Sequence, residues 1–477
     1  MTDHFFLVGI GGAGLSAIAR FLKEKGYRVS GSDQYLSANA EALIASGIPV
    51  FTTHSGDHLK DVNFVIQSSA IPKNNPEITT AIAMKIPVYK RADILPILTK
   101  GQEVIAVAGT HGKTTTSAMI AFVLHQLGLD PSFIIGSRSK NLGKNAHYGS
   151  GKFFVIEADE YDNMFLGLEP TIGVVTNVEH EHIDFFPTYQ SYLEAFIRFG
   201  NKVKRGGKLI VCSDSSGVND MITRINHPAV ITYGTNPDCA YIATDISLSP
   251  SGDYTFKVVH PQAGKNAFHG IVHLNVPGIH NVYNALATLA IVNELNLDTS
   301  QAMKTIGEYK GTARRFDVLG VVKGITIIND YAHHPTEIKA ALQAAKTRFS
   351  GRKIWAVWQP HTYTRTESLL DDFLQSFKDA DAVIISDVYA SRERNENFSL
   401  FHLIENINHS NATYIPGLDE IAQHLIENLK TGDVFIVLSA GDAIQVSQSV
   451  LTALSKSSDN QSENEIKPDQ TPLWNNQ

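Results

Sequence analysis

The sequence predicts an α/β protein of three domains: an N-terminal Rossmann-like domain, a central P-loop ATPase-like domain with a mostly parallel sheet, and a C-terminal Rossmann-like domain. Short apolar strands alternate with helical patterns along most of the chain, which indicates parallel sheets covered by helices. Two glycine-rich loops, "VGIGGAG" and "AGTHGKTTT", each follow a strand and open a helix. The length of 477 residues also exceeds what a single hydrophobic core supports.

Composition excludes several classes of protein. The net charge of −8 argues against a nucleic-acid partner, because such proteins present a basic face. Two cysteines, Cys212 and Cys239, cannot form a disulfide framework, so we expect a cytoplasmic protein. The apolar start could pass for a signal peptide, but it lacks a basic segment before it and a cleavage site after it. Since no uninterrupted run of about 18 apolar residues occurs, we expect no membrane partner.

The first domain is predicted to cover residues 1–98. It begins with a strand over His4–Val8, a helix over Leu15–Lys25 and a strand over Tyr27–Ser32. Further alternation of strands and helices follows, up to a joint with the next domain at residues 94–102. This order predicts a parallel sheet whose first turn is the glycine loop.

The first glycine loop has the spacing G-x-G-x-x-G, with an acid at the tip of the next strand. In a dinucleotide fold these glycines admit a pyrophosphate close to the backbone, and the acid binds a ribose. NAD and a UDP-sugar present the same diphosphate, and a glycine turn without any ligand is the plainer alternative. The residues concerned are Gly9, Gly11, Gly12, Gly14 and Asp33.

The second domain, residues 99–310, carries the second loop. The common formula G-x-x-x-x-G-K-[ST] would place its first glycine at Val107, so the loop is atypical. Its glycines still supply backbone donors, its lysine a point charge and its hydroxyl groups a Mg²⁺ ligand, all of which favour nucleotide binding. We expect the loop to be exposed, so that replacing its lysine leaves folding intact. The loop comprises Gly109, Thr110, His111, Gly112, Lys113, Thr114 and Thr115.

Two polar clusters end strands that follow the P-loop strand. "EADEYD" crowds Glu157, Asp159, Glu160 and Asp162 together, and such crowding needs a cation or a basic group. "TNVEHEHID" offers His182 among other polar groups after the next strand. A parallel sheet would bring both clusters to one edge, which favours Mg²⁺ over zinc, although each alone could be an ordinary polar loop.

The third domain is predicted over residues 311–454. Its strands at 324–330, 353–360, 382–390 and 433–441 each end in polar residues, where open α/β sheets bind ligands. Helices are expected at 335–346 and 369–377. Residues 455–477 are rich in Ser, Asp, Asn and Gln and are predicted to be a disordered tail.

Taken together, these motifs resemble the Mur ligases, ATP-dependent enzymes that build the peptide of peptidoglycan precursors. The resemblance covers about residues 1 to 455 and rests on "GTHGKTTT", "EADE", "TNVEHEHID", "GIHNVYNALA", "GTARRFD", "NDYAHHPTEI", "WQPHTYTRT" and "LSAGDA", in the family's order. It places the first P-loop glycine at Gly109 and implies a UDP diphosphate, not NAD, at the N-terminal loop. The third-domain motifs resemble the branch that joins L-alanine to UDP-N-acetylmuramate.

The resemblance also implies ligands and residue roles. ATP and Mg²⁺ would be the cofactors, UDP-N-acetylmuramate and L-alanine the small-molecule partners, and the protein a monomer or homodimer. Lys113 would bind the phosphates, while Thr114, Glu157 and His182 would hold the metal. An arginine, Arg314 or Arg315, would face the transferred phosphate. The adenine would contact His280, Asn281 and Asn284, and the third domain would contribute Asp330, Tyr331, His333, His361 and Arg365.

Departures from the family's pattern affect the amino-acid pocket. Thr362 stands where a basic residue is common, which leaves Arg365 to bind the amino acid's carboxylate. The implied reaction phosphorylates the lactyl carboxylate, after which the amine attacks; His333 or His182 would take the amine's proton. Three rival hypotheses remain: a ligase that joins a recycled tripeptide to the same sugar nucleotide, a non-enzymatic nucleotide-binding regulator, and a hydride-transferring dehydrogenase.

Overall fold

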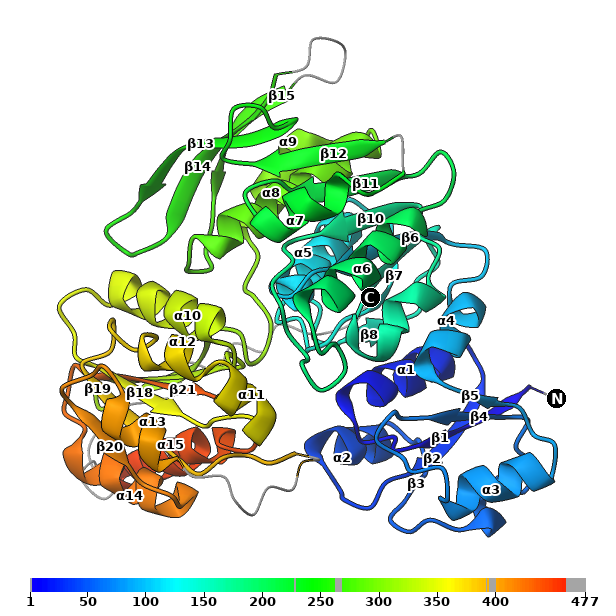
Figure 1. Ribbon diagram of the computed structural model, residues 1–477, viewed down its shortest axis with the longest axis horizontal. Helices are drawn as coiled ribbons and strands as arrows, with labels where there is room; N and C mark the ends of the chain where they lie inside the picture. The colour runs from blue at the N-terminus through cyan, green and yellow to red at the C-terminus, as the bar shows by residue number, and fades with distance from the viewer. Residues whose placement is uncertain (1, 227–228, 262–267, 392, 394–399, 460–477) are drawn as a thin grey trace. The chain divides into compact units, whose positions relative to one another are not determined.

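The computed structural model describes residues 2–226, 229–261, 268–391, 393 and 400–459 (Figure 1). The chain divides into two compact units, of which the first is residues 1–317 with 343–350 and the second is 318–342 with 351–477. Three separate β-sheets lie in these units, two in the first and one in the second. The expected three-domain α/β fold class is confirmed.

The N-terminal sheet has five parallel strands in the order β3-β2-β1-β4-β5. Alternate residues of β1 point to opposite faces: Phe5 and Leu7 pack with helix α1, whereas Phe6 and Val8 pack with α3. The predicted first strand is therefore central and buried. The elements are β1 (His4–Val8), α1 (Ala13–Glu24), β2 (Arg28–Ser32), α2 (Ala38–Ala45), β3 (Val50–Phe51), η1 (Gly56–Leu59), β4 (Phe64–Gln67), α3 (Pro76–Ala83), β5 (Val88–Tyr89) and α4 (Arg91–Leu98).

The central sheet has ten strands in the order β15-β14-β13-β12-β11-β10-β6-β9-β7-β8. The P-loop strand β6 lies between β9 and β10, and both neighbours are parallel to it. The strands are β6 (Glu103–Ala108), β7 (Ser132–Ile134), β8 (Ala146–His147), β9 (Phe153–Glu157), β10 (Ile172–Val175), β11 (Lys208–Cys212), β12 (Val230–Gly234), β13 (Tyr241–Leu248), β14 (Tyr254–His260) and β15 (Phe268–His273). The helices are α5 (Lys113–Gln126), η2 (Tyr161–Gly167), α6 (Tyr189–Asn201), α7 (Ser216–Ile222), α8 (His280–Glu294) and α9 (Thr299–Gly307).

The third sheet has six strands in the order β16-β17-β21-β18-β19-β20. Strand β21 is parallel to β17 on one side and to β18 on the other, so the ends of all three lie at one edge. The strands are β16 (Asp317–Val322), β17 (Ile325–Asp330), β18 (Ile354–Trp358), β19 (Ala382–Ile385), β20 (Ala412–Tyr414) and β21 (Val434–Leu438). The helices are α10 (Pro335–Arg348), α11 (Tyr363–Ser368), α12 (Leu370–Leu374), α13 (Phe401–Asn406), α14 (Leu418–Asn428) and α15 (Ile444–Asp459).

Helices lie in two of the predicted connections, of which only the tail was expected to be disordered. Helix α4 occupies most of the expected joint, because the apolar side chains of Ile94, Leu95 and Leu98 pack into the core. Residues 455–459 of the expected tail belong to helix α15, and residues 460–477 lie outside the described part of the chain. Within the described residues, no helix has both the length and the apolar character that crossing a membrane requires.

Candidate active site

The P-loop is a tight turn between β6 and α5 in which two glycines are sterically required. Gly109 has φ +138° and lies against the Thr176 hydroxyl group, so no Cβ fits there. Gly112 has φ +83° and forms the N-cap of α5. The Thr110 hydroxyl group donates to the Glu179 carbonyl oxygen over 2.9 Å, which ties the loop to the end of the neighbouring strand. The structure thus accounts for an atypical loop whose first glycine is Gly109.

Lys113 is not the exposed side chain that the sequence analysis expects. Only 13% of it is exposed, and its ammonium group lies 2.9 Å from a carboxylate oxygen of Glu160, which is fully buried. The ammonium group also donates to the carbonyl oxygens of Gly109 (2.5 Å) and Thr110 (3.0 Å). Burial lowers the pKa of Lys113, but Glu160 and neighbouring carboxylates raise it by more, so the pKa lies above its ordinary value. Replacing Lys113 therefore leaves a buried carboxylate without its partner.

The sheet order brings the two polar clusters beside the P-loop. "EADEYD" follows β9 and "TNVEHEHID" follows β10, the two neighbours of β6. Glu157 accepts a hydrogen bond from the Gly136 N–H over 2.6 Å. Burial raises the pKa of Glu157, while Lys113, the Thr114 hydroxyl group and Arg315 partly oppose the rise. The predicted pair Thr114 and Glu157 is thus in contact, and the charge of Arg315 is among the main influences on the pKa of Glu157. Which of Arg314 and Arg315 faces the transferred phosphate stays a prediction.

A second group of acids also lies near Lys113. Ligand atoms of Asp159, Glu160 and His182 all lie within 4.8 Å of one another, and His182 Nε2 is 3.5 Å from Glu160. Burial lowers the pKa of His182, but Glu181 and Glu160 raise it by more. Asp159 and Glu160 belong to the run for which the sequence predicts a Mg²⁺ site, although the family resemblance names only Glu157 in that run. Because carboxylate oxygens predominate around Lys113, the donor set fits a hard divalent cation such as Mg²⁺.

Arg91 is a residue that the sequence analysis missed. Its guanidinium group lies over the glycine loop: a Cβ on Gly14 would come within 2.9 Å of its Cζ atom. The same group forms an ion pair with Asp159 over 3.2 Å, and this pairing contributes to a lowered pKa of Asp159 that burial opposes. Arg91 therefore connects the first glycine loop with the acids beside the P-loop. No short motif marks it, since its partner lies 68 positions along the chain.

The first glycine loop is fixed by hydrogen bonds within the N-terminal domain. Gly9 has φ +83°, and its N–H donates to the Ser32 carbonyl oxygen over 2.8 Å. Asp33, expected to bind a ribose, instead accepts the Gly11 N–H over 2.9 Å. The Ser37 hydroxyl group donates to the Gly11 carbonyl oxygen over 2.9 Å. In this structure Asp33 therefore fixes the loop, and its predicted role in ligand binding stays a prediction.

The predicted adenine residues lie at the beginning of α8. Asn284 is buried; its side-chain oxygen accepts from the Thr116 hydroxyl group (2.9 Å), and its amide donates to Asn281 (3.0 Å). The Asn281 amide in turn donates to the Pro277 carbonyl oxygen over 2.6 Å. Asn284 thus joins α8 to the P-loop helix, and Asn281 holds Asn284 in place. His280 is exposed, which makes it the most accessible of the three to a base.

In the second unit, the motif after β17 orients a histidine. Asp330 is buried and accepts the Ala332 N–H over 2.7 Å. His333 Nδ1 lies 2.9 Å from the Tyr331 carbonyl oxygen and 3.3 Å from Glu337. Since both neighbours are acceptors, Nδ1 carries the proton, and Nε2 is the basic atom of the neutral ring.

The motif after β18 places a second histidine next to the first. The rings of His333 and His361 are 5.8 Å apart, and His361 stacks on Tyr389 at 5.6 Å. Arg365 donates to His361 Nδ1 over 2.9 Å and to the His361 carbonyl oxygen over 3.2 Å. Because a guanidinium group only donates, the proton of His361 is on Nε2. The structure therefore brings together the predicted residues of the third sheet.

Comparisons with known proteins cover all three sheets. A family model described as the Mur ligase family, catalytic domain, matches residues 4–103. The model of the Mur ligase middle domain matches residues 107–292, and that of the Mur ligase glutamate ligase domain matches residues 314–441.

Individual relatives extend over nearly the whole chain. The UDP-N-acetylmuramate–L-alanine ligase of Alkaliphilus metalliredigens is 39% identical, over 94% of this chain and 97% of its own. The enzyme of that name from Frankia casuarinae is 38% identical, over 95% of this chain and 98% of its own. Among solved structures, the UDP-N-acetylmuramate–alanine ligase of Thermotoga maritima has a TM-score of 0.80 at 28% identity, covering 96% of this chain and 100% of its own. A murein peptide ligase of Psychrobacter arcticus has a TM-score of 0.74 at 25% identity, covering 95% of this chain and 98% of its own.

Proposed function

Because the chain belongs to the Mur ligase family, we propose that it joins L-alanine to the lactyl carboxylate of UDP-N-acetylmuramate, using ATP. The observation that carries this proposal is the P-loop between two acidic clusters, combined with relatives of that activity along nearly the whole chain. The products are an amide, ADP and phosphate. The reaction serves the synthesis of peptidoglycan.

The first step transfers the γ-phosphoryl group of ATP to the sugar's carboxylate. A carboxylate is a poor electrophile, and phosphorylation supplies a leaving group. Backbone N–H groups of the P-loop, the Lys113 ammonium group and the Arg315 guanidinium group stabilise the charge on the transferring phosphoryl oxygens. To bind the phosphates, the Lys113 ammonium group must give up its hydrogen bonds to the carbonyl oxygens of Gly109 and Thr110 and donate to phosphate oxygens instead.

A divalent cation fits beside this loop. Glu157 and the Thr114 hydroxyl group would hold it, and His182 with Glu160 offers further ligands. Burial raises the pKa of Glu157, because the nearby positive charges of the protein do not fully compensate for the loss of water. When bound, the cation neutralises phosphate charge.

The second step requires an amine that has lost a proton. Between the two histidines considered, His333 suits this role better, because its Nδ1 is fixed as a donor and Nε2 is left as the base. His182 lies among carboxylates that raise its pKa and so keep its proton in place. Arg365 would bind the carboxylate of alanine, and its bond to His361 orders that neighbouring ring.

One experiment tests the reaction and its route together. ADP release would be measured with UDP-N-acetylmuramate and each of alanine, glycine, serine and the tripeptide L-alanyl-γ-D-glutamyl-meso-diaminopimelate. We expect alanine to give the highest kcat/KM; a preference for the tripeptide would support the recycling ligase instead. With ¹⁸O in the sugar's carboxylate, label should appear in the released phosphate. No transfer of label would rule out the acyl phosphate.

A further inference from the structure

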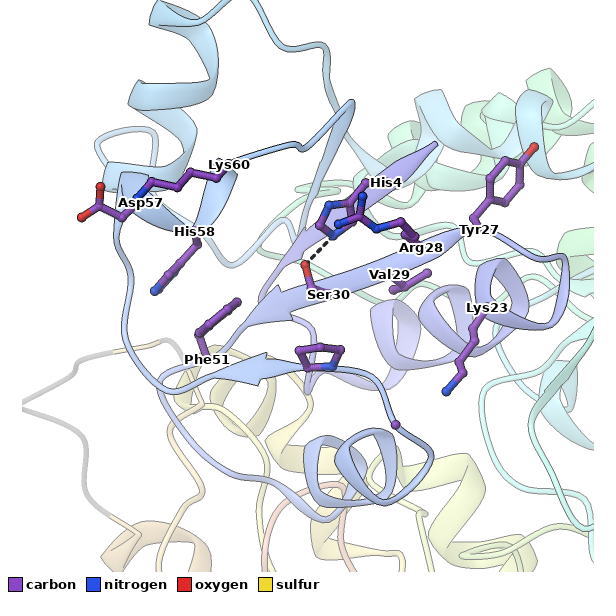
Figure 2. Close-up of a pocket in the computed structure, with 12 residues that line it drawn as sticks. His4, Lys23, Tyr27, Arg28, Val29, Ser30, Phe51, Asp57, His58 and Lys60 are labelled. Carbon is purple, nitrogen blue, oxygen red and sulfur yellow. Dashed lines mark hydrogen bonds between the residues drawn. The ribbon is translucent and has the colours of Figure 1, made fainter. Parts of the chain in front are cut away.

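A pocket of about 570 Å³ lies in the N-terminal sheet, away from the glycine loop (Figure 2). Its lining includes His4 at the beginning of β1 and Arg28 at the beginning of β2. The glycine loop follows the other end of β1. Four residue steps at ~3.3 Å separate the two ends of that strand by about 13 Å, so this pocket is not the site of the predicted diphosphate.

Basic side chains outnumber acids around the pocket. Lys23, Arg28 and Lys60 line it, with Asp57 the one acid among the lining residues. In the contacts described for this chain, Arg28 and Lys60 take part in no ion pair. Burial, and then the charge of Arg28, lower the pKa of His4. Three basic side chains and one acid therefore leave an excess of positive charge among the lining residues, although the chain as a whole carries −8.

The edge of β2 adds a backbone donor. The Gly31 N–H donates to the Pro49 carbonyl oxygen over 3.1 Å, and the Asp33 N–H donates to the Phe51 carbonyl oxygen over 2.9 Å. Backbone N–H groups of alternate residues point to the same side of a strand, so the Val29 N–H points to the side of β3 as well. Pairing between β2 and β3 begins only at Gly31, and Val29 lines the pocket. The open strand edge thus directs an N–H group toward the cavity.

A rigid aromatic wall completes the pocket. The rings of Phe51 and His58 stack at 4.1 Å with an angle of 9° between their planes, and 38% of Phe51 is exposed. His58 is held in place by Glu77, whose carboxylate lies 2.9 Å from Nδ1 and is fully buried. Figure 2 shows the two rings next to each other beside the strand edge. The exposed ring surface is suited to a flat group.

We propose that this pocket binds the phosphate group of a small molecule. Arg28, Lys60 and the Val29 N–H are the donors; a guanidinium group, an ammonium group and a backbone N–H together make a common set for phosphate oxygens. The volume accommodates a molecule of nucleotide size. Free diphosphate and the phosphate group of a nucleotide would bind to the same donors. Only a nucleotide would also place a flat base against the exposed ring of Phe51.

Lysine footprinting tests the proposal on the full, unaltered chain. The protein is acetylated briefly with and without pyrophosphate or UMP at constant ionic strength, and mass spectrometry gives the modification rate of each lysine. We expect either ligand to slow modification of Lys60 at least threefold. Lys85, exposed in the same domain, should react at an unchanged rate. Protection at a lower concentration of UMP than of pyrophosphate would identify the nucleotide as the source.

Variants separate binding from general charge effects. Arg28→Ala should abolish the protection of Lys60, whereas Lys73→Ala, at another exposed position of the same domain, should leave it intact. Equal melting temperatures would show that both variants are folded. If neither ligand at about 20 mM, a concentration that would reveal even weak binding, slows modification of Lys60, the proposal is overturned. Equal protection of Lys60 and Lys85 would overturn it as well.

Discussion

Removing the Lys113 ammonium group should destabilise the central domain as well as stop turnover. The variant Lys113→Ala leaves the fully buried Glu160 carboxylate without the partner that lies 2.9 Å away. Breaking a buried ion pair from one side costs about 3–5 kcal/mol, because an uncompensated charge remains. The lower end of this range applies here, since His182 lies 3.5 Å from Glu160 and supplies part of the missing charge. We therefore expect a loss of about 3 kcal/mol.

Hydrogen exchange read by mass spectrometry measures this loss where it occurs. The tryptophans of the described chain, Trp355 and Trp358, lie in the second unit, so their fluorescence does not report on the P-loop. Peptides covering β6 and α5 should exchange roughly a hundredfold faster in Lys113→Ala if exchange follows the opening free energy. Adding Glu160→Gln should recover much of the protection, because the unpaired charge is gone.

An exposed ion pair in the same domain provides the matched control. Lys152 lies 3.1 Å from Glu103, with 64% and 40% of their side chains exposed. Lys152→Ala should cost about 0–1 kcal/mol, as surface pairs do. If exchange in Lys113→Ala stays within twofold of the wild type, the pair with Glu160 does not support the fold, and the reasoning from burial is wrong.

Three further predictions concern the metal, the sugar nucleotide and pH. Glu157→Gln and His182→Ala should each raise the Mg²⁺ concentration for half-maximal rate at least fivefold; unchanged values in both would separate these residues from the metal. Gly11→Val should raise KM for the sugar nucleotide tenfold or more with KM for ATP unchanged, because its Cβ would lie 2.8 Å from the Ser37 hydroxyl group. Burial raises the pKa of Glu24, but hydrogen bonds from His147 and the Tyr148 N–H lower it by more, to about 2. The same contact raises the pKa of His147. The pair should therefore stabilise the protein between pH 4.5 and 6.5, and its contribution should fall as pH drops toward 2 or rises through the folded-state pKa of His147. Glu24→Gln should lower the free energy of unfolding most in that window, by about 1 kcal/mol after screening of a partly exposed pair. A pH-independent difference would contradict this linkage.

Much of the site follows from the order of strands along the chain. The strands before the two polar clusters flank the P-loop strand, as expected for strands of one parallel sheet, although β7 and β8 come between β6 and β9 in the chain. The common P-loop formula does not predict the position of Gly109, which the family resemblance supplied; the positive φ of +138° there now explains why a glycine is needed. The burial of the Lys113 side chain could not be predicted from the sequence. The direction of this side chain depends on Glu160, which is 47 positions away in the chain and lies at a sharp turn. Asp162 and Asn163 in that turn both have φ +54°, a local conformation that sequence patterns do not specify.

The run "EADEYD" shows why a crowded motif does not predict a single role. Its carboxylates have different partners: Glu157 contacts Thr114, Asp159 pairs with Arg91, and Glu160 pairs with Lys113. Asp162 lies 3.7 Å from Lys90, next to Arg91 in the chain. Half of these acids thus bind the end of the N-terminal domain, and half face the P-loop. Like charges so close together are stable only when each has its own counter-charge. That requirement ties Lys90 and Arg91, at the end of the N-terminal domain, to the acids beside the P-loop. Neutralising Asp159 alone should therefore weaken binding of the sugar nucleotide through Arg91, while a change at Glu160 should act first on ATP.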